Sequence, residues 1–339
     1  MFSIQSFSSL IENNNSILAN TSRDLLNGLK INHDNQWYVC GNLALNEAQF
    51  PHKLINSSPT DVDYQLLLKA AMLLVHESVE QPLTITTGFP YATYRVYKDQ
   101  AIEYLKKTHI IEYDSSTFSS TGGKKTVMLD VQNVDVIPEI AACTIALRKG
   151  ETQASGNFFV LSCGFGTFES VLSMDSGIVE HTMISTLGMR YAVNVMMNDL
   201  VKNYYLEFRN AHLLDEAFQK GHIILNKKNI DLKEMRKNAL KTYYNEVISP
   251  NLRNVITDAN LMKTNKIYLC GGAMYYQDLV DCFKAEFGDI ASLEFVSDPA
   301  NVASKGYALN SLRISGGLTK SSIGIDIGNA TTVVTQFTE

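Results

Sequence analysis

The chain lacks the residue patterns that are typical of disulfide-bonded proteins, of proteins stabilised by structural metal ions and of nucleic-acid-binding proteins. Its five cysteines are odd in number and form no Cys-x-x-Cys pair, and its seven histidines show no metal-ligand spacing. Lys and Arg together number 29 against 35 Asp and Glu, a net charge of −6, and no basic run stands out. We therefore expect buried thiols in a reducing compartment and no direct contact with nucleic acid.

Long hydrophobic runs are also missing. No segment approaches the roughly 20 apolar residues that a membrane-spanning helix needs. The first residues, Met-Phe-Ser-Ile-Gln-Ser-Phe, have neither the basic start nor the apolar stretch of a signal peptide. The expectation is a cytoplasmic protein without a membrane partner. At 339 residues and 45% hydrophobic content, the chain exceeds one ordinary domain and can bury a large core.

Strand-like and helix-like segments alternate along the chain, as they do in α/β proteins. The expected strands are 36–40, 83–87, 126–131, 134–137, 158–161, 168–172 and 267–269, and the expected helices are 61–79, 94–107, 138–146, 187–204, 212–219, 232–257, 274–287 and 302–312. The small, polar stretch 149–157 predicts a boundary between two lobes, residues 1–150 with 305–339 and residues 151–304. The first lobe is expected to carry a small insertion at about residues 10–60.

The most informative segment is the last one, where two apolar runs flank a tight turn and predict a hairpin over residues 322–337. The turn segment contains Asp326, Gly328, Asn329, Thr331 and Thr332. Such a turn can press backbone N–H groups and hydroxyls against a polyphosphate, with the carboxylate near a bound metal ion. An ordinary structural turn is the alternative, because Asp-x-Gly turns are common.

A second segment has the same shape. It contains Ser162, Gly164, Gly166 and Thr167, with glycines where a backbone must approach phosphate oxygens. The alternative is a β-hairpin with a glycine bulge. The two hairpins form a weak internal repeat.

A third segment, Gly271, Gly272, Ala273 and Met274, ends a strand, turns and starts a helix. Glycines there let the backbone lie flat against a nucleoside, and the helix N-terminus faces an anion. A Gly-Gly pair by itself is weak evidence.

A fourth element is Pro138-Glu139 at a predicted helix start. Proline there initiates a helix, and a first-turn carboxylate is favoured by the helix dipole. The functional alternative is that Glu139 positions or deprotonates an attacking water.

In order, with the final hairpin moved to the front, these four elements resemble the motifs of the actin, sugar kinase and heat-shock chaperone superfamily. The segment Ser185-Thr-Leu-Gly188 also resembles the turn that follows the second phosphate hairpin there. The resemblance is greatest to bacterial plasmid-segregation actins of the ParM type. It implies an α/β, two-lobed actin-like fold, each lobe a mixed sheet flanked by helices. It also implies a circular permutation, because hairpin 322–337 would open the chain in that superfamily.

The resemblance further implies a filament-forming ATPase that binds ATP and Mg²⁺ between its lobes. Its polymerisation would follow the nucleotide, and it would segregate plasmid DNA through a DNA-binding adaptor protein. Asp326 would lie near the metal ion and Glu139 would align the attacking water. The other implied contacts are Gly328, Asn329, Thr331, Thr332, Ser162, Gly164, Gly166 and Thr167 for the phosphates, Gly271, Gly272, Ala273 and Met274 for adenosine, and Glu216 and Lys220, on helix 212–219 and just past it, for the ribose or adenine.

Two positions depart from the family pattern. Ser162 stands where the family usually has an aspartate that helps to hold the metal ion, and Val333 stands where many actins have a lysine. Both changes concern the hydrolysis rate more than nucleotide binding. Two other functions therefore stay open, a non-hydrolysing actin-like scaffold and a small-molecule kinase of the same superfamily.

The permutation makes a geometric prediction. Met1 and Glu339 are expected at neighbouring strand ends, and Phe337 and Ile4 in one sheet; placement in different sheets would rule the permutation out. A second possibility is that the terminal hairpin completes a neighbouring subunit by strand exchange.

Overall fold

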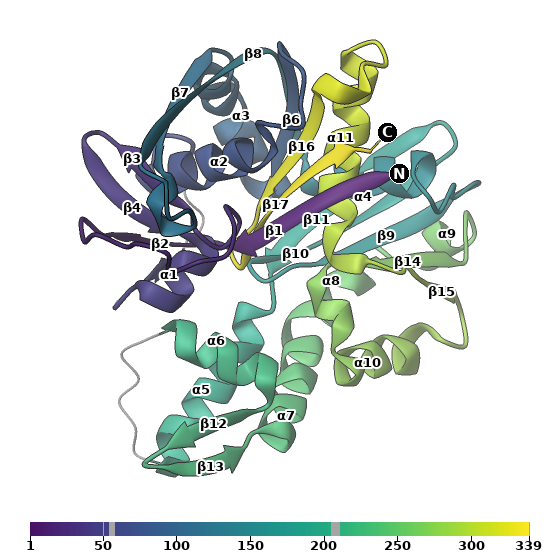
Figure 1. Ribbon diagram of the computed structural model, residues 1–339. Helices are drawn as coiled ribbons and strands as arrows, with labels where there is room; N and C mark the ends of the chain where they lie inside the picture. Colours follow the sequence, from purple (N-terminus) through teal and green to yellow (C-terminus); the bar gives the residue numbers. More distant parts are fainter. Residues whose placement is uncertain (50, 54–57, 205–210, 339) are drawn as a thin grey trace. The chain divides into compact units, whose positions relative to one another are not determined.

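The computed structural model describes residues 1–49, 51–53, 58–204 and 211–338. The chain divides into two compact units, Met1–Ala154 with Asn301–Glu339 and Ser155–Ala300 (Figure 1). Each unit is a mixed β-sheet with helices packed against it. Residues 50 and 54–57 of the expected insertion, and Glu339, lie outside the described residues.

One sheet organises the first unit. In order across it, its described strands are β1 (Phe2–Ser8), β17 (Thr331–Phe337), β16 (Ser322–Ile327), β6 (Leu83–Phe89), β8 (Lys124–Pro138), β7 (Thr108–Asp114), β3 (Lys30–His33), β4 (Gln36–Cys40), β2 (Leu10–Asn13) and β5 (His52–Lys53). β16, β6 and β8 run parallel, with Gly324 beside Thr86 and Thr86 beside Asp135. β6 and most of β16 are buried on both faces, which is why they read as nearly continuous apolar runs.

Both ends of the chain meet in this sheet. β1 pairs antiparallel with β17, so that Phe2 lies beside Phe337 and Ile4 beside Thr335. Phe337 and Ile4 therefore share a sheet, the condition that the permutation had to meet. The hairpin β16–β17 pairs with β6 and β1 of its own chain.

Helices cover both faces of the central strands. They are α2 (Val62–Val75), α3 (Tyr91–Leu105), α4 (Glu139–Lys149) and α11 (Val302–Ile314). α1 (Gly41–Glu47) contacts β1, β2 and β4 instead. α2 contacts β16 and β17, and its apolar side chains share a core with Ile323 and Ile325. α11 packs on the other face of β16, where a Cβ atom on Gly324 would lie 2.3 Å from the backbone nitrogen of Ala308. Glycine at 324 thus lets the helix approach the strand.

Buried polar groups fix α11 on the sheet. Ser311 Oγ donates a 2.7 Å hydrogen bond to the carbonyl oxygen of Ile323 on β16. Asn310 Nδ2 donates a 2.8 Å bond to Asp135 of β8 and contacts Thr86 of β6 at 3.2 Å. Because buried polar groups are costly unless they are paired, these bonds select one position of the helix.

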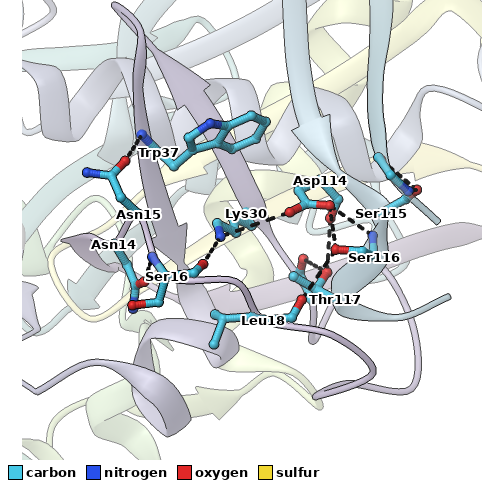
Figure 2. A network of polar contacts seen from close by, with 12 residues as sticks. Asn14, Asn15, Ser16, Leu18, Lys30, Trp37, Asp114, Ser115, Ser116 and Thr117 are labelled. Atoms are coloured by element: carbon cyan, nitrogen blue, oxygen red, sulfur yellow. Dashed lines mark hydrogen bonds and ion pairs between the residues drawn. The ribbon is translucent and has the colours of Figure 1, made fainter. Parts of the chain in front are cut away.

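A second polar network holds the long loop between β2 and β3 (Figure 2). Lys30 of β3 donates a hydrogen bond to the carbonyl oxygen of Ser16, and its ammonium lies 4.0 Å from the Asp114 carboxylate. Ser116 Oγ donates to the carbonyl oxygen of Leu18 at 3.3 Å. Lys30 is 4% exposed; its burial lowers the pKa of the ammonium, and Asp114 opposes that shift. The loop is therefore tied to the end of β7.

The second unit has its own sheet, whose described strands are, in order, β11 (Gly177–Leu187), β10 (Thr167–Met174), β9 (Phe158–Cys163), β14 (Lys266–Cys270) and β15 (Ser292–Phe295). A separate hairpin joins β12 (His222–Leu225) and β13 (Lys228–Asp231). The helices are α5 (Arg190–Tyr204), α6 (Ala211–Lys220), α7 (Lys233–Tyr243), α8 (Ser249–Arg253), α9 (Asp258–Leu261) and α10 (Gln277–Phe287). Side chains of β9, β14, α7 and α10 share one hydrophobic core.

Several elements differ from expectation, among them β11, β12, β13 and β15, which were not predicted. The two strands expected at 126–131 and 134–137 are one strand, β8. The helix expected at 232–257 is broken into α7, a π-helical turn at Tyr244–Ile248, and α8; Pro250 has no N–H to continue the α-helical ladder. Lys220 lies inside α6, which ends before Gly221 at a φ of +71°.

The cysteines are free thiols. Cys40, Cys143, Cys163 and Cys270 are buried and Cys282 is half-buried. Burial raises the pKa of the Cys163 and Cys270 thiols to about 12, so these groups are inert at neutral pH. Across the described residues, every helix is too short or too polar to cross a membrane.

Candidate functional site

Two predicted residues of the first unit lie at one edge of its sheet. Because β16, β6 and β8 are adjacent and parallel, their carboxyl ends meet at the same edge. Asp326 is near the end of β16, and Glu139 directly follows β8. Strands lie about 4.8 Å apart, so the two backbones are separated by about 10 Å across β6. In α/β sheets, ligands bind outside the carboxyl ends of the strands.

Asp326 has an unusual carboxyl group. It lies two residues after Gly324, on the face of β16 that α11 covers, and it is half-buried. Burial raises the pKa of this carboxyl to about 7, far above its ordinary value of 3.8. A cation beside it would favour the charged form.

The donor set suits Mg²⁺ bound together with a nucleotide. Mg²⁺ in such sites takes one or two protein carboxylates, and phosphate oxygens and waters complete its shell. Asp326 supplies such a carboxylate at a sheet edge. Among the described residues, His, Cys, Asp and Glu side chains form no group of three or more that could hold a metal ion by themselves.

The turn after Asp326 is closed by its own backbone and held by the start of the chain. The N–H of Gly328 donates a 3.0 Å hydrogen bond to the carbonyl oxygen of Thr331. Ser9, between β1 and β2, donates from Oγ to the carbonyl oxygen of Gly328 at 2.6 Å and from its backbone N–H to that of Ala330 at 3.0 Å. Ser9 Oγ also lies 3.0 Å from Thr332 Oγ1.

The two threonines of this turn face different surroundings. Thr331 is exposed and Asn329 is half-buried, as a phosphate contact requires. Thr332 is fully buried and its hydroxyl meets Ser9. The Thr332 hydroxyl therefore supports the turn through Ser9, and its contact with phosphate stays a prediction.

Glu139 is the first residue of α4. Pro138 ends β8 and is the N-cap residue, with φ −57° and ψ 140°. Glu139 is half-buried. Its carboxylate is stabilised at the positive end of the helix dipole, so it is suited to accept a hydrogen bond from water.

In the second unit, the turn between β9 and β10 is tightly packed. The N–H of Gly164 donates to the carbonyl oxygen of Thr167 at 2.9 Å, and the N–H of Gly188 donates to that of Gly166 at 3.0 Å. A Cβ atom on Gly188 would lie 2.5 Å from the backbone nitrogen of Thr167. Glycine at 188 is therefore required for the segment after β11 to support this turn.

The glycine pair after β14 lies beside that turn, because β14 and β9 are adjacent and parallel. Gly271 has a φ of +90°, and a Cβ atom there would lie 2.3 Å from the carbonyl oxygen of Cys163. Its N–H donates a 2.7 Å hydrogen bond to the carbonyl oxygen of Pro299. At Gly272, by contrast, a Cβ atom would meet one neighbour, Ala300 Cβ at 3.9 Å. Gly271 is thus structural and Gly272 leaves space.

The remaining predicted residues of this unit have varied surroundings. Ser162 is 3% exposed and lies beside Glu169 of β10 in register, so its side chain is buried on one face of the sheet just before the turn. Ala273 is buried and Met274 is half-buried.

Glu216 and Lys220 form an ion pair on α6. Phe218, on the same helix, meets the Tyr276 ring at a centroid distance of 5.5 Å. This contact brings α6 to the segment that follows the glycine pair.

The structure thus brings together Asp326, the 328–332 turn and Glu139 in one unit, and Ser162, the 164–167 turn and the 271–274 segment in the other.

Sequence reasoning missed two supporting residues, Ser9 and Pro299. Ser9 is 319 residues from Gly328 along the chain, and no local pattern around it signals a role. The predicted permutation was the one available signal, since it placed Ile4 and Phe337 in one sheet.

Residues 3–140 match the family model described as the N-terminal domain of actin-like proteins. Comparison with curated protein sequences gave no match. This similarity covers less than half of the chain.

Solved structures extend the similarity to almost the whole chain. A ParM filament from Clostridium botulinum superposes with a TM-score of 0.73, at 18% identity over 91% of this chain and 92% of that one. Ta0583, an archaeal actin homolog, superposes with a TM-score of 0.67, at 15% identity over 91% and 92%. A complex of Ta0583 with ADP gives a TM-score of 0.61, at 16% identity over 85% and 89%. The chain therefore has the actin-like α/β fold that the four motifs predicted.

Proposed function

We propose that this chain is a filament-forming actin-like ATPase, which binds ATP with Mg²⁺ and polymerises under nucleotide control. The observation that carries the proposal is the placement of Asp326 and Glu139 at one edge of the parallel strands β16, β6 and β8. The similar structures include a complex with ADP and two filaments. These support a nucleotide and further copies of the chain as its partners.

In this proposal, backbone turns bind the phosphates. The 328–331 turn and the 164–167 turn each follow a strand and are closed by a backbone hydrogen bond, Gly328 to Thr331 and Gly164 to Thr167. Glycine at these positions lets the backbone approach phosphate oxygens. Gly272, which has open space at Cβ, faces adenosine, and the Glu216–Lys220 pair contacts the ribose or adenine.

Asp326 and Glu139 perform the chemistry. Asp326 holds Mg²⁺, which when bound neutralises the charge that develops on the phosphates. Glu139 orients the attacking water through its carboxylate. Positioning of this kind, with charge stabilisation, supplies most of the rate in phosphoryl transfer.

The circular permutation is part of the proposal. The N–H of Thr338 donates a 2.9 Å hydrogen bond to the carbonyl oxygen of Met1, so a short turn could join the two chain ends. A chain joined there and opened between Gly316 and Gly317, which both have positive φ and open space, should fold and bind ATP as the natural one does. Loss of folding in that rearranged chain would contradict the permutation.

Plasmid DNA reached through an adaptor protein is the proposed cargo, and the cytoplasm is the proposed compartment. The net charge of −6 favours an adaptor over direct DNA contact. A non-hydrolysing scaffold is the second candidate, favoured by Ser162, which offers no charge where the ParM-type pattern that this chain resembles usually has an aspartate.

Light scattering with parallel measurement of phosphate release, after ATP and Mg²⁺ are added to the purified chain, tests the function. Scattering that rises and then decays as phosphate appears is the expected result. Scattering without phosphate would favour the scaffold. Phosphate without scattering, at every protein concentration, would exclude the filament.

A further inference from the structure

Ser9 holds the turn of hairpin β16–β17 from the opposite end of the chain. Its hydroxyl donates a 2.6 Å hydrogen bond to the carbonyl oxygen of Gly328, and its N–H donates a 3.0 Å bond to that of Ala330. Ser9 is 1% exposed and Thr332, its third contact, is 0% exposed. Both bonds reach the loop that joins the two strands.

These bonds determine how the peptide groups of the turn point. In a trans peptide, the C=O and the N–H of one unit point in opposite directions. Because Ser9 binds the carbonyl groups of Gly328 and Ala330, the N–H groups of the same two units, those of Asn329 and Thr331, point away from Ser9. N–H groups that a turn presents on the same side form an anion-binding concavity.

The backbone around Ser9 is itself fixed. Phe7, two residues earlier, is 2% exposed and lies beside Thr332 in the β1–β17 ladder. Gly41, at a φ of +60°, approaches the Phe7 ring so closely that a Cβ atom there would lie 2.8 Å from it. Leu10 and Ile11, which follow Ser9, are buried. Ser9 therefore cannot move away without disturbing packed neighbours on both sides.

We propose that Ser9 is a positioning residue for phosphate binding, which sets the amide groups of the 328–331 turn in the conformation that accepts the nucleotide. The inference rests on the proposed function and adds a residue to its site. It also makes the residue directly after β1 part of the nucleotide site, although the turn that it supports is at the other end of the sequence.

The test compares Ser9→Ala with a matched control, Thr335→Val. Thr335 lies on β17 and is 0% exposed, and its hydroxyl donates a 3.0 Å bond to Ser304. Each substitution removes a buried hydroxyl bond, but only Ser9 reaches the turn. Ser9→Cys, which keeps the volume and has a weak donor, serves where the alanine variant does not fold.

Two measurements on the full chain decide the matter. Affinity for ATP with Mg²⁺ should fall about threefold to tenfold in the Ser9 variants, the range for one lost hydrogen bond, and remain unchanged in Thr335→Val. Amide hydrogen exchange without nucleotide should quicken at residues 327–332 in the Ser9 variants and not in Thr335→Val.

Ser9 variants with wild-type affinity would overturn this inference and leave the proposed function intact. An equal loss of affinity in Thr335→Val would do the same, because the effect would then be general destabilisation. A wild-type chain that binds no ATP with Mg²⁺ would overturn the proposed function, and this inference with it.

Discussion

A Cβ atom on Gly306 of α11 would lie 1.9 Å from the carbonyl oxygen of Ala142 on α4. The two helices are therefore packed backbone to backbone at this point. In a helix interior, replacing glycine by alanine normally stabilises the helix by about 1 kcal/mol. For Gly306→Ala we expect destabilisation instead. The free energy of unfolding should fall by about 2–3 kcal/mol, because the backbone must shift to make room for the methyl group.

Urea denaturation of Gly306→Ala checks this expectation. Gly123→Ala is the control, since a Cβ atom there would meet nothing within 4 Å and the backbone is not left-handed. An unchanged unfolding midpoint for Gly306→Ala would mean that α11 and α4 are further apart than described.

The glycine pair after β14 gives two opposite predictions. Gly271→Ala should lower the free energy of unfolding by more than about 2 kcal/mol, because φ is +90° and the methyl group would meet Cys163 backbone at 2.3 Å. Gly272→Ala should change stability by no more than about 0.5 kcal/mol, since its surroundings are open.

Nucleotide affinity separates the two glycines further. Gly272→Ala is expected to weaken ATP binding several-fold, because the methyl group would occupy the space proposed for adenosine. Titration with a fluorescent ATP analogue measures it. Wild-type affinity in Gly272→Ala would remove that glycine from the proposed site.

Asp326 predicts a pH dependence. Its folded-state pKa of about 7 is above its ordinary value of 3.8, so the folded chain binds more protons than the unfolded one between these values. The contribution of this group to the free energy of unfolding should therefore decrease as pH rises from about 4 to 7. Asp326→Asn should lack that contribution and gain stability relative to wild type at pH 8.

The same substitution should abolish the Mg²⁺-dependent part of ATP affinity, and that affinity should rise with pH through 7 in the wild type as the carboxyl ionises. Urea denaturation at pH 5 and pH 8, with nucleotide titrations at both, measures each effect. Asp99→Asn, on the exposed surface of α3, is the control. Equal stability of Asp326→Asn and wild type at pH 8 would contradict the burial of this carboxyl.

Glu139→Gln should leave ATP affinity unchanged and slow phosphate release by about a hundredfold or more, the range for a lost acid–base group. The amide keeps the size of the side chain and loses the charge that orients water. A coupled phosphate assay in single-turnover conditions measures the step directly. Glu103→Gln, on an exposed position of α3, controls for charge; equal turnover in both variants would exclude Glu139 from the mechanism.

Local patterns predicted the elements of the fold well where each pattern was long. The alternation of strands and helices, the buried apolar strands and the two glycine hairpins follow from side-chain periodicity and glycine placement. The break of the helix expected at 232–257 was missed, because a π-helical turn at Tyr244–Ile248 depends on how neighbouring helices pack, and apolar spacing carries no sign of it.

The sequence predicted the residues of the candidate site but not the residues that support them. Asp326, Gly328 and Glu139 were predicted from local signatures of turns and helix starts, and their roles stay predictions. Ser9 was not predicted, because a hydrogen bond between residues that are 319 positions apart gives no local pattern in either segment. The burial of the Thr332 hydroxyl was missed for a similar reason, because its side-chain partner is Ser9, at the opposite end of the chain.

The sequence by itself determined the class of fold and the order of the motifs, because periodicity, glycine and proline act through local backbone preferences. Only the tertiary structure decided that β1 pairs with β17 and that Asp326 and Glu139 lie at one sheet edge. It also decided that Gly306 and Gly324 let α11 pack closely against α4 and β16. These relationships depend on which distant surfaces bury one another, and burial is a property of the folded whole.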